Sequence, residues 1–233
     1  MPRLPLIEDL TSGPIPAGSA LIVEYDAASQ WYSACVSIAA GWIKSGGKVE
    51  YFLNTQLPHD LRARLKLLGL DVENAEKENM IQIWDTYTIT LGQKSTEKYS
   101  YNSLKVVDLT TQYARDYMRS EPAPDVLLIS DNFSVLSRFN EEKVWVEYAL
   151  YRAIPGRRSA KRTAIRGIMN GVHSEWAYRQ LEGAADGIVD FKLQEVDGET
   201  KNVMRVRSMR NVGFDSKWYL VRIAENFEAA LEK

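Results

Sequence analysis

The chain has 233 residues, of which 45% are hydrophobic and 26% are charged, and this is the composition of an ordinary globular protein. Its 29 Lys and Arg residues nearly balance 31 Asp and Glu residues, and a net charge of -2 argues against a dedicated binder of nucleic acid or anionic membranes. One cysteine excludes an internal disulfide, no apolar run is long enough to span a membrane, and the first twenty residues lack the pattern of a signal peptide. We therefore expect a cytoplasmic protein.

The first predicted elements have the shape of a phosphate-binding loop. Residues 1–19 are rich in Pro, Gly and Ser and are expected to form an entry segment, followed by a single domain over residues 20–233. Ala20–Val23 is a predicted strand, and a helix begins after a short connection, near Gln30. The pattern of a phosphate-binding loop at this place is G-x-x-x-x-G-K-[ST]. Laid on it without gaps, this chain has Glu24, Asp26, Ala27, Ser29, Gln30 and Trp31, and every diagnostic position differs.

The substitutions remove the chemistry that holds a nucleotide. In a phosphate-binding loop the glycines let backbone N–H groups close on the phosphates, the lysine reaches the terminal phosphates, and the hydroxyl holds Mg²⁺. Glu24 and Asp26 would also set carboxylates near the phosphates, where two unit charges ~4 Å apart repel by roughly 4 kcal/mol at an effective dielectric constant of about 20. We expect triphosphate binding to be opposed. The alternative is that both side chains point into solvent and leave the pocket merely empty.

The helix predicted over Gln30–Ser45 has two adjacent apolar stripes, which is typical of a helix packed on a sheet, and Gly46-Gly47 ends it. Cys35 lies in one of these stripes, so we expect a packed core thiol rather than a nucleophile. The two histidines, His59 and His173, are not in a metal-like spacing with Cys35. The sequence therefore predicts no metal site.

The middle of the chain continues the alternation of strands and helices. Val49–Leu53 is a predicted strand, and Pro58 lies near the start of the next helix, where proline is tolerated. Residues 92–103 are polar and predict a loop, while Val106–Arg119 predicts a helix that the prolines at 122 and 124 end.

Val126–Ile129 is a fully apolar run, which is typical of a central parallel strand covered on both faces. Asp131, or Ser130 if the register is shifted by one residue, follows at the carboxyl end, where open α/β sheets place their ligands. Asp131 could order Mg²⁺, or it could make hydrogen bonds only. The loss of the lysine and the hydroxyl from the loop favours the second interpretation.

Asn140 is predicted to cap a helix that runs through Arg152 and ends at Pro155-Gly156. A dense basic cluster comes next, for which we expect a solvated loop at the outer rim, with contact to phosphate or RNA as the alternative. The cluster consists of Arg157, Arg158, Lys161, Arg162 and Arg166.

The last third of the chain predicts more strands. They are Thr163–Met169, Gly187–Leu193 and Trp218–Ile223, together with a hairpin whose turn is Asp197-Gly198 and whose second strand is Val203–Arg207. Residues 170–179 are expected to form a loop after the carboxyl end of a strand, and its side chains His173, Trp176 and Arg179 suit contact with a partner. The alternative is that Trp176 packs back on its own domain.

Several segments, in their order along the chain, carry a resemblance to one family. They are Ile15–Ser19 (similar to G-I-P-x-G-S), Tyr51–Leu53 with Leu61–Asp71 (a strand and a helix ending in L-G-x-D), Met80–Thr88 (L-x-I-x-D-x-x-S), Asp125–Leu136 (a Walker B strand) and Arg207–Arg210 (K-M-R-G). This ordered set resembles KaiC-like proteins of the RecA superfamily. The fold that it implies is α/β: a RecA-like, mostly parallel sheet with helices on both faces and a small antiparallel C-terminal extension.

The resemblance also implies roles for particular positions. Active relatives carry a glutamate pair that polarises the attacking water, and here the corresponding residues look like Thr55 and Gln56. A neutral amide can orient water but cannot take its proton. Asp131 is Walker B-like, and in ring-forming relatives the loop that holds His173 and Trp176 faces the pore.

The segment Arg207–Arg210 concerns how chains could assemble. In KaiC-like ATPases its Lys and Arg reach across the subunit boundary to a neighbour's phosphate, whereas here Ser208 stands in place of the Lys and Arg210 is retained. An arginine without a phosphate still needs an anion. We expect Arg210 to pair with Glu24 or Asp26 of a neighbouring subunit, the alternative being a contact within its own chain.

The leading hypothesis is a non-catalytic KaiC-like pseudo-ATPase without a cofactor, acting as an oligomerising scaffold or as the regulatory partner of another protein, possibly an active KaiC-like relative. One alternative is a KaiC-like ATPase that binds nucleotide in an atypical loop. Another is an accessory protein for nucleic acid that resembles the recombinase paralogues. The net charge makes the last of these the least favoured.

Overall fold

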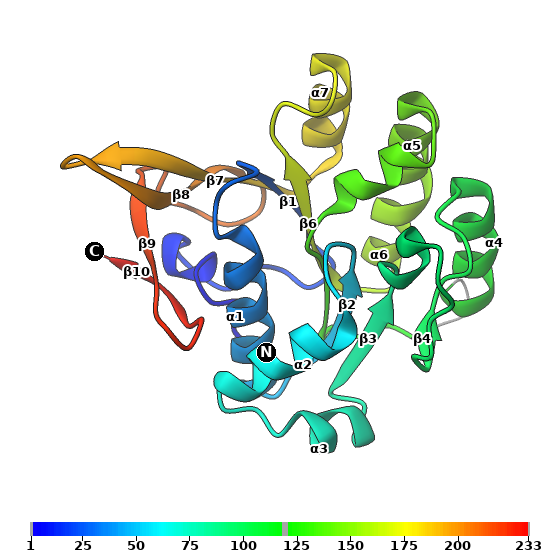
Figure 1. Ribbon diagram of the computed structural model, residues 1–233. Coiled ribbons are helices and arrows are strands. Elements are labelled where there is room, and N and C mark those ends of the chain that lie inside the picture. Colours follow the sequence, from blue (N-terminus) through cyan, green and yellow to red (C-terminus); the bar gives the residue numbers. More distant parts are fainter. Residues whose placement is uncertain (1, 118–120, 233) are drawn as a thin grey trace.

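The computed structural model describes residues 2–117 and 121–232, apart from the side chains of residues 112–117. Its strands form a ten-stranded sheet in the order β10-β9-β8-β7-β1-β6-β5-β2-β3-β4 (Figure 1). The strands are β1 (Ala20–Tyr25), β2 (Lys48–Leu53), β3 (Ile81–Asp85), β4 (Tyr99–Ser100), β5 (Val126–Ser130), β6 (Thr163–Met169), β7 (Gly187–Val196), β8 (Glu199–Met209), β9 (Tyr219–Ile223) and β10 (Ala229–Glu232).

The sheet is parallel over most of its width. β1 lies inside it and pairs in parallel with β6 on one side and β7 on the other. β2 to β5 continue the parallel part, whereas β8, β9 and β10 pair antiparallel. Every residue of β5 is buried, which a strand of apolar residues achieves when both faces of the sheet are covered. The predicted fold, with its antiparallel C-terminal extension, is confirmed.

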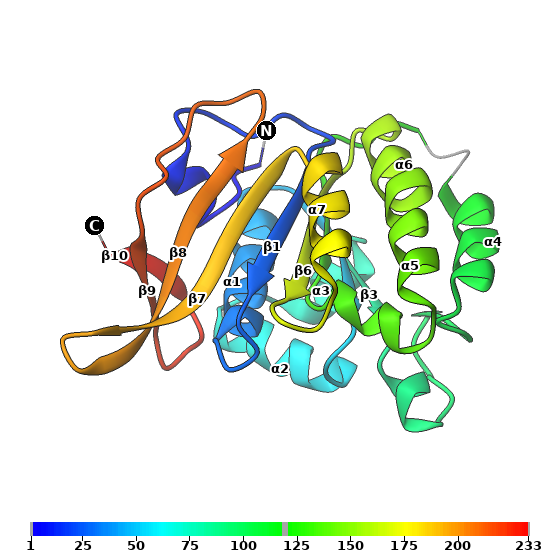
Figure 2. The same cartoon turned by 90° about the horizontal axis from the view of Figure 1, so that it is seen from above.

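Helices cover both faces of the sheet (Figures 1 and 2). One face carries α1 (Trp31–Lys44), α2 (Pro58–Leu67) and α3 (Val72–Lys77), and the other carries α4 (Val106–Tyr117), α5 (Glu142–Tyr148), α6 (Ile154–Ser159) and α7 (Glu175–Ala184). Alternation along β1 sends Leu21 and Val23 into the core under α1, and Ile22 into the core under α5 and α7. Among the described residues, no helix has the length and hydropathy that crossing a membrane requires.

Short 3-10 helices complete the elements, at Glu8–Leu10, Thr88–Leu91 and Phe133–Arg138. The segment before β1 packs on the α1 side of the sheet, where Leu4, Leu6 and Ile7 are buried.

The predicted end of the helix at Pro155-Gly156 is wrong. A π-helical segment over Ala149–Ala153 follows α5 and leads directly into α6, so helical structure continues to Ser159. Pro155 falls in the first turn of α6 and has no N–H to donate to the π-helical turn before it. The wider turn of the π segment restarts the helix and so accommodates the proline.

The predicted cap at Asn140 is also wrong. Its side chain accepts a hydrogen bond from the backbone N–H of Val106 at 2.7 Å and donates to the carbonyl oxygens of Leu104 and Leu136. Asn140 therefore ties the start of α4 to the segment before α5, and the residue at the N-cap of α5, Glu141, makes no side-chain cap.

The loop predicted over residues 170–179 is helical in its second half. Ser174 is the N-cap of α7, and its Oγ accepts a hydrogen bond from the N–H of Ala177 at 3.2 Å. Trp176 and Arg179 therefore lie on a helix, while His173 precedes it. The short α3, β4 and β10 were not predicted either.

Candidate functional site

The connection between β1 and α1 is a strand-to-helix turn that lacks the backbone conformation of an anion-binding nest. An anion-binding nest needs residues in the left-handed region, and residues 24–31, all of them described, have no positive φ. Two backbone N–H groups of the loop are also in use: that of Asp26 donates to the carbonyl of Phe191, and that of Ser29 to the carbonyl of Asp26. No anion cradle is formed here by the backbone.

The start of α1 is capped by a side chain from β8. The N–H of Gln30 donates to Oδ1 of Asn202 at 2.9 Å, and Nδ2 of Asn202 donates to Oε1 of Gln30 at 2.8 Å. Gln30 stands where a phosphate-binding loop has its lysine. The pair holds this side chain against the β7–β8 hairpin, which projects from the body of the sheet (Figure 2).

Trp31 fills the space behind the loop. Its side chain is buried, with 1% relative exposure, and Nε1 donates to the backbone carbonyl of Asp131 at 3.0 Å. The indole packs against the rings of Tyr25 and Phe191, with centroids 6.1 and 5.5 Å away. A Cβ added to Gly167 would lie 2.5 Å from Nε1, so a glycine on β6 is required for this close approach.

Asp131 lies at the carboxyl end of β5 and bonds to protein groups. Oδ1 accepts the N–H of Asn54 at 3.2 Å, and Oδ2 accepts the hydroxyl of Thr55 at 3.1 Å. Burial raises the pKa of Asp131 to about 7, although these hydrogen bonds act in the opposite direction. Ser130 is the neighbouring candidate, and its Oγ accepts Nδ2 of Asn54. Both candidates for the Walker B position are therefore tied to the strand end of β2.

The two acidic residues of the loop contact other residues of the chain. Glu24 lies on the α7 face of β1, 2.6 Å from Nη2 of Arg207, and burial followed by a hydrogen bond with Glu182 raises the pKa of Glu24 to about 7. Asp26 accepts Nδ2 of Asn170 at 2.8 Å and the N–H of Leu193 at 3.0 Å. Both carboxyl groups thus have partners inside the chain, so the alternative in which both side chains point into solvent is wrong.

Aromatic residues surround Trp31 and Cys35. Burial raises the pKa of the Cys35 thiol and of the Tyr25, Tyr32 and Tyr51 hydroxyl groups, so all four stay neutral near pH 7. Cys35 is fully buried, as a core thiol should be. A buried core rich in aromatic residues therefore lies between β1, β2 and α1, beside the loop.

Thr55 and Gln56 occupy the positions after β2 that the resemblance assigns to the glutamate pair. The Thr55 hydroxyl is bonded to Asp131, and Nε2 of Gln56 is buried with no hydrogen-bond partner among the described residues. Neither side chain can act as a general base.

In the late segment, Arg207 rather than Arg210 reaches the acidic residue of β1. Arg210 donates to the carbonyl oxygen of Gly183, at the C-terminal end of α7, at 2.7 Å. Ser208 pairs in register with Ile188 of β7. Glu24 forms an ion pair with Arg207 within the chain, and the expected pairing of Arg210 with Glu24 or Asp26 of a neighbouring subunit stays a prediction.

His173, Trp176 and Arg179, which were expected to contact a partner, differ from one another in exposure. The His173 side chain is buried against Trp145, with ring centroids 4.3 Å apart, and its Nε2 lies 2.7 Å from Oγ of Ser134. Trp176 is 45% exposed and Arg179 forms an exposed pair with Glu175. The exposed part of the group is therefore on α7, and His173 is part of the core.

The expectation that the basic cluster forms a solvated loop is wrong. Glu50 on β2 is buried and accepts hydrogen bonds from Arg157 and Arg162, each at 2.5 Å. Arg158 pairs with Asp186 at 2.9 Å, and Arg166 is buried with its guanidinium over the ring of Phe133. Lys161 is exposed. The four arginines of the cluster thus contact other residues of the chain, and Lys161 is its exposed member.

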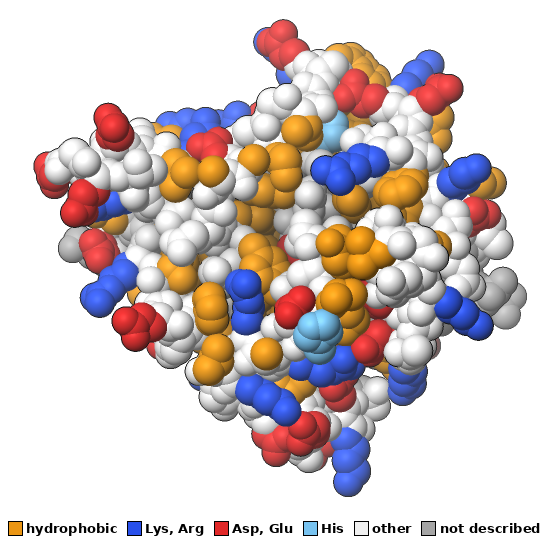
Figure 3. Space-filling model, viewed as in Figure 1, with side chains coloured by type: hydrophobic (Ala, Val, Ile, Leu, Met, Phe, Trp, Pro, Cys, Tyr) orange, Lys and Arg blue, Asp and Glu red, His pale blue; other side chains and the backbone are white. Residues whose placement is uncertain are grey.

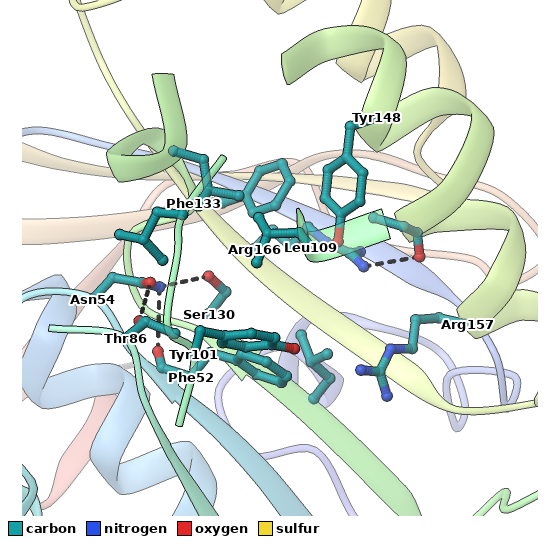
Figure 4. A pocket seen from close by; sticks show the side chains of 14 residues that line it. Phe52, Asn54, Thr86, Tyr101, Leu109, Ser130, Phe133, Tyr148, Arg157 and Arg166 are labelled. Carbon is teal, nitrogen blue, oxygen red and sulfur yellow. Dashed lines mark hydrogen bonds between the residues drawn. The ribbon is translucent and has the colours of Figure 1, made fainter. Parts of the chain in front are cut away.

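A cavity of about 60 Å³ lies on the other face of the sheet from α1 (Figure 4). Aromatic rings of Phe52, Tyr101, Phe133 and Tyr148 line it, and a hydrogen-bonded group of Asn54, Thr86 and Ser130 closes one end. A polar-ended cavity of this volume has room for a few water molecules. Sequence reasoning did not find it, because its walls come from strands and helices far apart along the chain.

The parallel sheet, with a strand–loop–helix unit at β1 and an acidic residue after β5, defines a RecA-like α/β domain. A family model described as "ATPase: KaiC" matches residues 54–228, which is more than half of the chain. The chain therefore belongs to the KaiC ATPase family, and the resemblance in the sequence is confirmed. The matched region begins after β1, the loop and α1.

Among solved structures, the fold is similar to a KaiC-like protein from the hyperthermophilic archaeon Pyrococcus horikoshii OT3. The TM-score is 0.74 at 19% sequence identity, and the similarity covers 99% of this chain and 96% of that chain. At this identity the likeness concerns the fold. No curated protein sequence matches the chain.

Proposed function

We propose that this chain is a KaiC-like domain that neither binds nor hydrolyses ATP, and that it acts through protein contacts, as an oligomerising scaffold or a regulatory partner. The observation that carries the proposal is the placement of Trp31. Trp31 is the residue that the sequence comparison aligns with the Mg²⁺-binding hydroxyl; its indole is buried, and Nε1 donates to the backbone carbonyl of Asp131.

The other residues of the site do not fit Mg·ATP either. No lysine is present in the loop, three of its N–H groups (those of Asp26, Ser29 and Gln30) already donate to Phe191, Asp26 and Asn202, and Asp131 is buried. Binding a triphosphate would need these bonds to break and the indole to leave its core. Each of these changes opposes binding, so we favour an inactive site over an ATPase with an atypical loop.

The basic cluster was the main support for the alternative of a nucleic-acid accessory protein, and the contacts of its arginines weaken that alternative. Arg157, Arg162 and Arg158 are paired with Glu50 and Asp186 and are not available for phosphates. Electrostatic binding to nucleic acid depends on cations that are free to displace counterions. We therefore favour a protein over nucleic acid as the partner of this chain.

The partner surface is proposed to include the exposed part of α7. Trp176 is 45% exposed and Val172, in the loop before the helix, is 52% exposed. Apolar side chains gather near α7 and α5 in the space-filling view (Figure 3). Exposed tryptophan is enriched where proteins bind each other.

Light scattering tests this proposal. We expect an assembly of two or more chains whose mass is the same with and without Mg·ATP, and a smaller mass for Trp176→Asp. Leu67→Asp is the matched control, because Leu67 is similarly exposed but lies on α2, on the other face of the sheet. A monomer at all concentrations would contradict self-association, and an assembly that forms only with Mg·ATP would contradict the inactive site.

A further inference from the structure

The β7–β8 hairpin extends beyond the strands on either side of it (Figures 1 and 2). β1 pairs with β7 only as far as Phe191. β9 pairs with β8 only over residues 202–204, whereas the ladder between β7 and β8 runs on to Val196 and Glu199. A two-stranded hairpin on its own is marginally stable in water, and an unpaired strand edge is a template for another strand. The end of this hairpin is therefore open to pairing with a further chain.

The backbone N–H and C=O groups of Thr200 point to the open side of β8. Leu193 on β7 donates its N–H to Asp26, on the side of β1, so the next residue, Gln194, directs its backbone groups towards β8. Gln194 pairs with Lys201, and Lys201 therefore faces β7. Thr200, the residue before it, faces the other way, and in the described part of the sheet the ladder with β9 ends before reaching it.

A hollow of about 250 Å³ lies beside this edge, and Thr200, Leu220 and Arg222 are among the residues that line it. The hollow forms because β9 leaves β8 after Val221 and continues with β10, where Ile223 pairs with Ala229. An added strand runs about 4.8 Å from the edge with which it pairs. Space for a short strand is therefore present where β8 no longer has β9 as its neighbour.

The edge sequence Glu199-Thr200-Lys201 is complementary to itself. Glu199 and Lys201 project from the same face of β8 and form an ion pair 3.3 Å apart, in which the Glu199 side chain is 74% exposed. When two copies pair antiparallel about a twofold axis at Thr200, the two Thr200 residues exchange both backbone hydrogen bonds. Glu199 of each copy then lies opposite Lys201 of the other, and facing opposite charges and facing threonines both stabilise antiparallel strands. A register moved towards Asn202 is blocked, because Asn202 already pairs with Val221.

We propose that β8 is the contact strand of a symmetric dimer, in which two copies of this chain pair antiparallel over residues 199–201 and join their sheets edge to edge. The inference rests on the self-association proposed above and gives it a second contact, separate from Trp176 on α7. A twofold contact of this kind closes after two chains. Growth beyond a dimer then needs the contact at α7.

Sedimentation of the Trp176→Asp protein isolates the β8 contact, and we expect this variant to be a dimer. Adding Glu199→Lys or Lys201→Glu sets like charges opposite each other twice in the dimer and should raise its dissociation constant about tenfold. Making both changes together exchanges the charges and restores opposite pairs, so the constant should return to within about twofold of its starting value. Glu195→Lys, at an exposed acidic residue of β7, is the control and should leave the constant unchanged.

Cross-linking locates the axis of the dimer. Cys35 is the one cysteine of the chain and is buried, so Thr200→Cys supplies a single exposed thiol per chain. The Cα atoms of facing residues in a hydrogen-bonded antiparallel pair lie about 5.5 Å apart, within reach of a short bifunctional thiol reagent. We expect a covalent dimer from Thr200→Cys and none from Gln194→Cys, the matched exposed position on β7.

The β8 contact and the α7 contact fail in different ways. Recovery by the double charge change and a cross-link at Thr200→Cys, with an assembly mass that Trp176→Asp leaves unchanged, would support β8 and contradict only the α7 contact. A Trp176→Asp protein that is monomeric at all concentrations would overturn the β8 contact and leave the α7 contact standing. Double and single charge changes of equal effect, or no cross-link at Thr200→Cys, would overturn it as well, and this is the result expected if a strand of another protein occupies the edge.

Discussion

Replacing Trp31 by alanine is expected to lower the free energy of unfolding by about 3–5 kcal/mol, because a fully buried aromatic side chain is removed from a packed core. The lost contacts include the rings of Tyr25 and Phe191 and the hydrogen bond to the carbonyl of Asp131. Urea unfolding followed by circular dichroism measures this change.

The matched control for this substitution is Trp176→Ala. It removes the same side chain from a helix, but from a place with 45% exposure, so the expected loss is well below that of Trp31→Ala. Equal losses for the two variants would show that the indole of Trp31 is not held in the core, and the space behind the loop would then be open to a ligand.

Replacing Glu50 by alanine is expected to cost about 3–5 kcal/mol, because it leaves buried guanidinium charge without its carboxylate. Arg157 is 3% exposed, and both Arg157 and Arg162 bond to Glu50. Urea unfolding is again the measurement. The control is Glu175→Ala, which breaks the exposed pair with Arg179 and should leave stability nearly unchanged. A small effect at Glu50 would mean that the basic cluster is solvated after all.

Much of the fold could be predicted because its signals are local. Thr163–Met169 was predicted with the bounds that β6 has, and Gly46, with φ of 90°, ends α1 where the glycine pair indicated. The helix α7 was missed because residues 170–179 were interpreted as one loop after a strand, although Ser174 is a start signal and Ala177, Leu181 and Ala184 repeat at helical spacing. The continuation through Pro155 depends on a π-helical turn, which no simple spacing predicts.

The sequence predicted where the loop between β1 and α1 lies along the chain, but not the directions in which its side chains point. The predicted strand ended at Val23, whereas β1 runs to Tyr25, and strand alternation then sets Glu24 on the face of Ile22, towards α7. Strand alternation, had the strand been extended to Tyr25, would have predicted the side of the sheet on which Glu24 lies. The partners of Glu24 and Asp26, namely Arg207 and Asn170, are remote in sequence, so the chain order alone could not reveal them.

Calorimetric titration of the purified protein with Mg·ATP tests most directly whether the loop has lost nucleotide binding. We expect no heat beyond that of dilution up to millimolar nucleotide, because Trp31, Gln30 and Asp131 are committed to other residues of the chain. An active KaiC-like relative with an intact loop is the positive control. Saturable binding of one nucleotide per chain with a Kd below about 1 mM, which corresponds to about -4 kcal/mol, would contradict the inactive site.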